Sequence, residues 1–396
     1  MNFSRREQDI LTCVARRDLD NRVRGQLRQL IDSNLDWDYL LSLANTHGLL
    51  PLLHKHLNST AWDSVPGEVL ARLKRESVAN RQSVLFLIGK LLKACQLFEA
   101  DGIEVAAFKG PLLAEMVYGE MSLRQAGDID ILIRPTDFAR AKEILESLGY
   151  EMVPQLTTAQ QSSHLASNCE IQFMRDDWFT VVDLHWGLTP KNFVFGLRSS
   201  DVMNRLQQVS FAGAQLKTFS PEDLLFYQSM HGAKHLWRRL EWISSIAELV
   251  RLMDAEAWNT LAERAVNAHG TRMLALGLRL VQILLDVHAP NQVLKKLDAD
   301  EAMLRHAKSV AENIFRPQLI DPDSTDTNLK NFRIMDRKRD AIASAFRSIF
   351  VPTLSDWEAL SIPGPLHSLY YAYRPFRLTK AYSASLLQRL KKRRDG

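Results

Sequence analysis

The most constraining feature of this 396-residue sequence is the run Gly-Asp-Ile-Asp-Ile-Leu-Ile at positions 127–133, where Asp128 and Asp130 alternate with isoleucines. Alternate residues of a β-strand project from the same face, so both carboxylates share one face while Ile129 and Ile131 point into a core on the other. Two carboxylates at this spacing repel each other unless a cation neutralises them. A two-metal site for phosphoryl or nucleotidyl transfer supplies such a cation and needs oxygen ligands of this kind.

A third candidate acid is Asp183, in the run Val-Val-Asp-Leu-His-Trp at positions 181–186. Alternation places Asp183 and His185 on one face of a second strand. With Asp128 and Asp130, Asp183 would complete a trio of metal ligands and would help to remove the proton of an acceptor hydroxyl. Surface carboxylates are the alternative explanation of Asp128 and Asp130, and a hydrogen-bonded structural role is the more common one for a histidine such as His185.

The dipeptide Lys109-Gly110 stands where a β-rich run gives way to a helical one. A glycine at such a turn lets backbone N–H groups approach a phosphate, the helix N-terminus attracts the negative charge, and a lysine adds a positive charge. Arg124, four residues before Asp128, is a second candidate for holding phosphate oxygens. Both features have structural alternatives, because glycine is common at such turns and arginine pairs readily with a carboxylate.

A basic cluster follows in the second half of the chain, made of His231, Lys234, His235 and Arg238. On one continuous helix these side chains form a single polar, basic stripe. A stripe that faced the acidic strand would bind phosphates, and an ordinary solvated helix face is the alternative. The two histidines also have the spacing of a zinc pair, but no third ligand of the HExxH kind is near, so zinc is not expected.

Hydrophobic residues recur at helical spacing over residues 6–100, which predicts an N-terminal helical region. The pattern then changes to short β-rich runs, at 103–108, 128–133, 150–153, 171–175 and 180–186. Helices are predicted between these runs at 112–118, after Pro111, and at 138–148, where Thr136 or Asp137 caps the start and Gly149 the end. Asp176-Asp177 is interpreted as the turn of a hairpin.

Helical spacing returns beyond Pro221 and predicts helices at 223–253, 255–268, 272–287 and 298–315. Residues 317–332 are predicted to form a linker or an exposed loop. The sequence therefore predicts an α+β fold, with a small mixed β-sheet core flanked by N-terminal and C-terminal helical regions. The expected parts are a helical region, an α/β core, a helical domain, and a linker with a C-terminal helical and basic segment, at 1–100, 101–218, 219–316 and 317–396.

Composition limits the class of protein. Hydrophobic residues make up 46% of the chain and charged residues 24%, which is typical of a globular protein large enough for two or three domains. The net charge of +4 is mild, so there is no strong nucleic-acid signal. Three separated cysteines, Cys13, Cys95 and Cys169, argue against a disulfide framework, and no apolar run has the length of a signal peptide core or a membrane span. We therefore expect a cytoplasmic protein.

The chain ends in an aromatic and basic segment, Tyr-Tyr-Ala-Tyr-Arg-Pro-Phe-Arg at 370–377, followed by Lys-Lys-Arg-Arg at 391–394. Such an end can make a weak peripheral contact with an anionic membrane or touch nucleic acid. A solvated helix end explains it as well, because cations are favoured at helix C-termini.

Together these motifs resemble the nucleotidyltransferase superfamily of the DNA polymerase β type, in which a Gly-containing turn and a helix precede a strand with Asp-x-Asp, and a third acid lies on a later strand. The resemblance is closest to an uncharacterised bacterial branch of it. The matching residues are Lys109-Gly110, Tyr118, Arg124, Gly127 to Asp130, Val182 to Trp186, and His231 to His235. A looser likeness extends to residues 47–53 and 370–377.

The resemblance implies Mg²⁺- or Mn²⁺-dependent transfer of an NMP group from an NTP, ATP among the candidates, to a hydroxyl of an acceptor, with pyrophosphate as leaving group. It implies that the catalytic residues and metal ligands are Asp128, Asp130 and Asp183. The residues expected to bind the nucleotide are Lys109, Gly110, Arg124, His231, Lys234 and His235. The acceptor, which is a small molecule, sugar, peptide or protein, is not identified.

Two departures from the family pattern limit what it implies. The usual Gly-Ser turn is Lys109-Gly110-Pro111 here, so a serine contact to the γ-phosphate is missing and Lys109 would replace it. Relatives often carry an aspartate soon after the helical tryptophan, where this chain has Ser244-Ser245, so the acceptor end is expected to differ. The alternatives to an enzyme are a noncatalytic nucleotide- or partner-binding module on the same fold, and a membrane-associated scaffold that uses residues 365–396.

Overall fold

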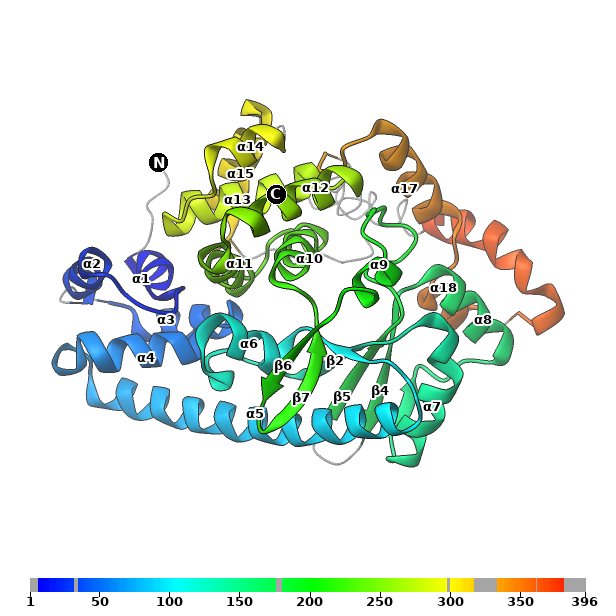
Figure 1. Cartoon of the computed structure of the whole chain (residues 1–396), viewed down its shortest axis with the longest axis horizontal. Coiled ribbons are helices and arrows are strands. Elements are labelled where there is room, and N and C mark those ends of the chain that lie inside the picture. Colours follow the sequence, from blue (N-terminus) through cyan, green and yellow to red (C-terminus); the bar gives the residue numbers. More distant parts are fainter. Residues whose placement is uncertain are drawn as a thin grey trace, which may run out of the picture.

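The computed structural model describes residues 6–31, 35–175, 180–297, 300–316, 333–360 and 362–380. Within these ranges a small β-sheet is surrounded by helices (Figure 1). The predicted hairpin turn Asp176-Asp177, the predicted linker at 317–332 and the basic end at 391–394 lie outside the described residues.

The N-terminal region is helical, as the spacing of its hydrophobic residues predicts. Its helices are α1 (Arg6–Val14), α2 (Asn21–Ile31), α3 (Trp37–Thr46), α4 (Leu50–Thr60) and α5 (Gly67–Ala100). Helix α3 begins where the Asp36 carboxylate accepts a hydrogen bond of 2.9 Å from the N–H of Tyr39, a side-chain cap of the usual kind. Figure 1 shows α5 running beneath the sheet, and its buried side chains, such as Ile88 and Leu91, belong to the core on that side.

Five strands form one mixed sheet. Their order is β1 (Ala106–Ala107), β2 (Asp128–Leu132), β5 (Thr180–His185), β4 (Glu170–Arg175) and β3 (Glu151–Val153). Strands β2 and β5 are parallel, and the other neighbours are antiparallel. The predicted α+β class with a small mixed sheet is confirmed. The predicted strand at 103–108 is wrong in length, because only Ala106 and Ala107 pair with β2. Phe108 follows the strand and stacks on Phe219 with ring centroids 4.6 Å apart.

The connections contain both predicted and unpredicted elements. Helices α6 (Gly110–Tyr118) and α7 (Phe138–Ser147) lie where the sequence predicts them, although Asp137 at the start of α7 makes no side-chain cap. Helices α8 (Thr158–Ser167) and α9 (Ser199–Met203) and the hairpin of β6 (Gln207–Phe211) and β7 (Ala214–Thr218) are additional.

The C-terminal half is helical again. Its helices are α10 (Pro221–Lys234), α11 (Leu240–Leu252), α12 (Ala255–Asn267), α13 (Thr271–Leu285), α14 (Asn291–Lys296), α15 (Glu301–Asn313), α17 (Lys338–Phe350) and α18 (Leu354–Ala359). The prediction of one helix over 223–253 is wrong. The helix stops because Leu236 and Trp237 take left-handed conformations, with φ of 54° and 55°, and the buried Trp237 ring packs against Gly232.

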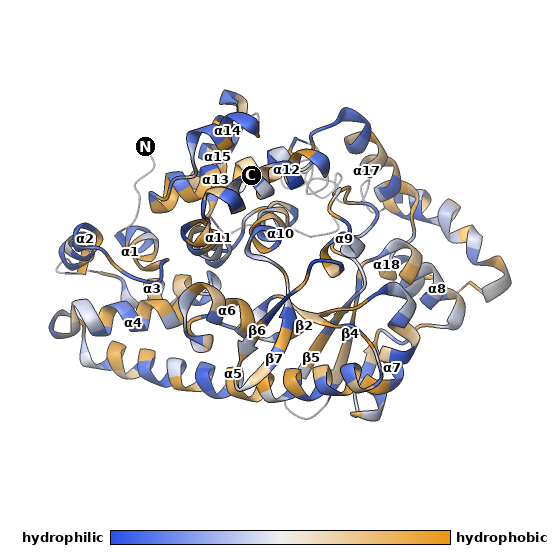
Figure 2. Ribbon diagram, viewed as in Figure 1, coloured by the Kyte–Doolittle hydropathy of each residue, from blue (hydrophilic) through white to orange (hydrophobic). Residues whose placement is uncertain are grey.

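Two hydrophobic cores hold the sheet in place. On one face, Ile129, Ile131 and Leu184 pack with residues of α5 and α7. The opposite face carries Asp128, Asp130 and Leu132, and Leu132 belongs to a larger core that joins the N-terminal helices to α10–α13. Figure 2 shows β2, β4 and β5 as mainly hydrophobic, whereas the peripheral α2 and α14 are largely hydrophilic. The larger core crosses the expected boundaries near residues 100 and 218, and the four-part division stays a prediction.

Part of the aromatic and basic segment at 370–377 packs inside the protein. The Arg374 guanidinium donates to Asp356 Oδ2 at 2.7 Å and Arg377 Nε donates to Asp356 Oδ1 at 2.6 Å, while Tyr370 is fully buried. These arginines are therefore engaged with a carboxylate, and the described residues give no support to a membrane contact. Among the described helices, none combines the length and hydrophobicity needed to cross a bilayer.

Candidate active site

The three candidate acids lie together on one face of the sheet. Because β2 and β5 are parallel neighbours, Asp130 is paired in register with Asp183, and Asp128 is paired with Val181. Ligand atoms of Asp130, Asp183 and His185 all lie within 4.8 Å of one another. The structure thus brings Asp130 and Asp183 together, on the face opposite the isoleucines, while Asp128 lies on the same face of β2 but is not part of this close group.

Asp130 is the centre of a buried chain of charged groups. Its Oδ1 accepts hydrogen bonds from Lys109 Nζ at 2.7 Å and from His185 Nε2 at 2.9 Å. The other ring nitrogen of His185 lies 2.9 Å from Glu170 Oε2. Burial alone would raise the pKa of Asp130, but Lys109 and His185 lower it to about 2. Burial would likewise lower the pKa of His185, which Glu170 and Asp130 hold well above its ordinary value.

The other two acids are less well compensated. Burial, together with the neighbouring Asp130, raises the pKa of the Asp128 carboxyl. Burial and Asp130 also raise the pKa of Asp183 to about 6, although Gln172 Nε2 donates a hydrogen bond of 3.0 Å to its Oδ1. The carboxylate face therefore carries more negative charge than its protein neighbours neutralise, which is the condition in which a divalent cation binds favourably.

The Lys109-Gly110 turn has the backbone shape that glycine allows. Lys109 is the N-cap of α6, and Gly110 has a φ of +56°, a region that residues with a Cβ atom rarely adopt. A Cβ at this position would lie 3.6 Å from the backbone oxygen of Asp128. The turn therefore lies next to the acidic strand in space, as the motif predicts.

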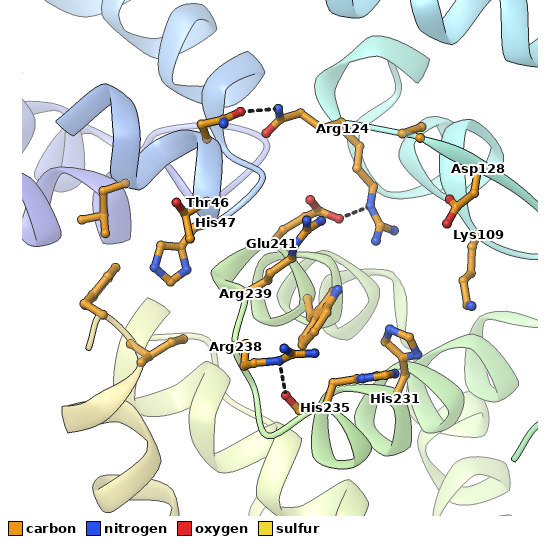
Figure 3. Close-up of a pocket in the computed structure, with 18 of the residues that line it drawn as sticks. Thr46, His47, Lys109, Arg124, Asp128, His231, His235, Arg238, Arg239 and Glu241 are labelled. Atoms are coloured by element: carbon orange, nitrogen blue, oxygen red, sulfur yellow. Dashed lines mark hydrogen bonds and ion pairs between the residues drawn. The ribbon is translucent and has the colours of Figure 1, made fainter. Parts of the chain in front are cut away.

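A cavity of about 1020 Å³ opens beside the acidic strand (Figure 3). Its lining residues on the acidic side are Lys109, Gly110, Arg124, Asp128 and Asp130, and on the opposite side His231, His235, Arg238, Arg239 and Glu241. The far end is formed by Tyr39 of α3, by His47 just after that helix, and by Phe315 and Arg316 after α15. Asp183 is not among the lining residues, so the cavity extends from the Asp128 side of the trio.

Arg124 lines the cavity but is paired with a carboxylate. Its Nε donates to Glu241 Oε1, and the side chains of both residues are buried. Burial would lower the pKa of the Arg124 guanidinium, and Glu241 raises it above its ordinary value. Of the two interpretations of Arg124 made from the sequence, the structure shows the carboxylate pair.

The predicted basic stripe is wrong as a continuous, charged helix face. Helix α10 ends at Lys234, so Arg238 lies beyond it on the turn to α11. Burial and then the nearby cations lower the pKa of His231 well below its ordinary value and that of His235 to about 3, so both rings are neutral. Lys234 does not line the cavity, and Glu170 raises its pKa against the effect of burial.

Two acidic residues of the site were not predicted. Glu170 begins β4 and is paired in register with His185, a relation that the expected hairpin around Asp176-Asp177 would have indicated. No pattern in the sequence indicates Glu241. Its contact with Arg124 depends on where α11 begins after the break that follows α10.

The expectation that the acceptor end differs because Ser244-Ser245 replaces an aspartate stays a prediction. Both serines are fully buried in α11, and Ser244 Oγ lies 2.8 Å from the hydroxyl of Tyr118.

Comparisons with known proteins give one family match and two weakly similar solved structures. A family model described as an uncharacterised nucleotidyltransferase matches residues 33–286, more than half of the chain. The solution structure of the antibiotic-resistance factor ANT(2'')-Ia is 15% identical and has a TM-score of 0.31, with 46% of this chain and 91% of that chain covered. The crystal structure of an antigenic nucleotidyltransferase-like protein from Paracoccidioides brasiliensis is 17% identical and has a TM-score of 0.28, with coverages of 52% and 94%. These TM-scores are too low to carry an argument, and the search of curated proteins found no match.

Proposed function

The chain belongs to this family of uncharacterised nucleotidyltransferases, and from that premise we propose that it transfers an NMP group from an NTP to a hydroxyl group of an acceptor. The observation that carries the proposal is the carboxylate trio, with Asp130 and Asp183 in register on adjacent strands and Asp128 on the same face. Strands fix these side chains more precisely than loops would, as group transfer requires.

The trio fits a divalent metal ion such as Mg²⁺ or Mn²⁺. Asp128, Asp130 and Asp183 offer oxygen ligands, and the raised pKa of Asp128 and of Asp183 reflects negative charge without enough compensation. When bound, the metal would stabilise the charge that develops on the α-phosphate and favour ionisation of the attacking hydroxyl. Both nitrogens of His185 are hydrogen-bonded to carboxylates, so His185 orients Asp130 and is not itself a ligand.

The reaction forms a bond between the acceptor oxygen and the α-phosphorus and breaks the bond from that phosphorus to the bridging oxygen. Pyrophosphate leaves with the electron pair. We assign the acceptance of the hydroxyl proton to Asp183, because its carboxylate lies in register with Asp130 on the adjacent strand.

The cavity suggests which side each substrate occupies. Asp128 and Asp130 line it and Asp183 does not, so the nucleotide lies in the cavity and the acceptor approaches from the Asp183 side. Its volume, about 1020 Å³, is at the upper end of the range for small-molecule sites. Gly110 brings backbone close to the phosphates, and the neutral rings of His231 and His235 offer hydrogen bonds.

Lys109 and Arg124 also belong to the nucleotide side, but each is already held by a carboxylate, Asp130 or Glu241. Lys109 contacts a phosphate only after it leaves Asp130. This ion pair also favours a second candidate function, a noncatalytic nucleotide-binding module, because the ammonium group supplies a cation at the acidic face.

The test is a screen of the common NTPs, ATP included, with Mg²⁺ or Mn²⁺ and with cell extract as a source of acceptors. Pyrophosphate release and transfer of an α-phosphate label are measured for the wild type and for Asp128→Asn/Asp183→Asn. We expect transfer by the wild type alone. Metal-independent NTP binding with no transfer to any acceptor would favour the binding module.

A further inference from the structure

The cavity contains more positive charge than the nucleotidyltransferase motifs account for. The cations that line it are Lys109, Arg124, Arg238, Arg239 and Arg316, and the carboxylates are Asp128, Asp130 and Glu241. Burial lowers the pKa of His47 to about 4, and His231 and His235 are neutral as well. Five cations against three carboxylates leave a net charge of +2 on this lining.

Pairing within the protein shows where the excess charge lies. Lys109 is bound to Asp130 and Arg124 to Glu241, and Arg316 also has a partner within the protein. Arg238, by contrast, makes within the described residues only a long hydrogen bond of 3.3 Å, from its Nε to the backbone oxygen of His235. The side chain of Arg239 makes no hydrogen bond or ion pair with any residue in the described ranges.

The turn that carries these two arginines is fixed on both sides. Before it, the N–H of Trp237 donates to the Gly232 oxygen at 2.7 Å, and the buried indole packs against Gly232. After it, the N–H of Leu240 donates to His47 Nδ1 and the N–H of Glu241 donates to the His47 oxygen, both at 3.2 Å. His47 thus uses the first N–H groups of α11, and the arginine side chains remain as the donors that the turn presents to the cavity (Figure 3).

We propose that Arg238 and Arg239 bind the β- and γ-phosphates of the NTP, an assignment that rests on the proposed function. The α-phosphate must lie beside Asp128 and Asp130, where transfer occurs, so the rest of the triphosphate extends into the cavity that the two arginines line. Guanidinium groups bind phosphate oxygens in a bidentate manner, and preorganised backbone lowers the cost of holding them there. The two arginines would replace the γ-phosphate contact that the serine of the Gly-Ser turn makes in the family pattern and that this chain lacks.

The test measures equilibrium binding by calorimetry in Mg²⁺, using an NTP analogue with a methylene group between the α- and β-phosphorus atoms and the matching NMP. The protein variants are Arg238→Ala/Arg239→Ala, the charge-preserving Arg238→Lys/Arg239→Lys, and the control Arg305→Ala. Arg305 is an exposed arginine of α15 whose ion pair with Glu301 is 3.4 Å long, and it does not line the cavity.

The double alanine variant should bind the NTP analogue about 100-fold more weakly, because charge-assisted hydrogen bonds are lost, while NMP binding changes by less than about threefold. The double lysine variant should lie between it and the wild type, and Arg305→Ala should match the wild type. Each single alanine variant gives the same comparison should the double variant not fold.

Equal losses for the NTP analogue and the NMP, or no loss for either, would overturn the assignment while leaving the proposed function intact. A wild type that binds no nucleotide in the presence of Mg²⁺ would overturn both.

Discussion

The acidic and the basic sides of the cavity are built in different ways. Asp128, Asp130 and Asp183 lie on two adjacent strands, and strand alternation plus one register places them together. The basic residues that line the cavity come from separate segments, and their counter-charges can lie far away in the sequence: Glu241, which pairs with Arg124, is 117 residues from it. Local pattern therefore shows where a charge is, but only the tertiary structure shows whether that charge is available to a ligand.

The sharpest contrast within the acidic side is between Asp130 and Asp128. Asp130→Ala should lower the free energy of unfolding by about 3–5 kcal/mol, because Lys109 and His185 would remain buried without their counter-charge. Urea denaturation at pH 7 measures this loss.

Asp128→Ala is the matched control for that experiment. Among the described residues the Asp128 side chain makes no hydrogen bond or ion pair, and its pKa is raised, so its removal should leave stability unchanged or slightly higher. Equal losses for the two variants would contradict the different roles assigned to them.

For the ion pair of Arg124 and Glu241, a double-mutant cycle tests whether Arg124 stabilises the fold. Arg124→Met alone should cost about 3 kcal/mol or more, because Glu241 is buried and would lose its partner. Arg124→Met with Glu241→Leu should recover most of that loss. Additive effects of the two substitutions in denaturation would show that the pair is not coupled.

The pH dependence of stability tests the raised pKa of Asp183, which contrasts with the lowered pKa of Asp130. The pKa of Asp183 is raised to about 6, so the folded protein binds a proton more tightly than the unfolded chain, and the free energy of unfolding falls as pH rises from about 4 to 6. Without metal, Asp183→Asn should therefore stabilise the protein by about 1–2 kcal/mol at pH 7.5 and by much less at pH 4. Urea titrations at both pH values measure the difference. If Asp183→Asn raised the free energy of unfolding equally at pH 4 and pH 7.5, the raised pKa of Asp183 would be contradicted.

A bound metal ion should neutralise the uncompensated negative charge of these carboxylates and so stabilise the folded protein. Mg²⁺ at about 10 mM should raise the Tm of the wild type by about 1–3 °C, since a ligand of millimolar affinity contributes about 1 kcal/mol. Asp128→Asn/Asp183→Asn should show no shift beyond that of a NaCl control at equal ionic strength. A shift of equal size in the variant would place the metal elsewhere.

The sequence predicts the acidic side well because its information is local. Period-two alternation identifies β2 and β5, and the short β-rich runs with helices between them indicate a small mixed sheet. The break between α10 and α11 could not be predicted in this way, since Leu236 and Trp237 take left-handed conformations that their residue types do not favour. Tertiary packing of Trp237 against Gly232 overrides the helical pattern there. The neutral state of His231 and His235 has the same origin, because burial is a property of the assembled fold.

The central claim is that the carboxylate face catalyses nucleotidyl transfer, and transfer of an α-phosphate label by wild type and Asp128→Ala tests it most directly. Both proteins are assayed with the active NTP, Mg²⁺ and the same extract, after denaturation has shown equal stability. The account predicts label on an acceptor with the wild type and a loss of about 1,000-fold or more with Asp128→Ala, which corresponds to about 4 kcal/mol of transition-state stabilisation. An Asp128→Ala protein that transfers label at the wild-type rate would contradict it.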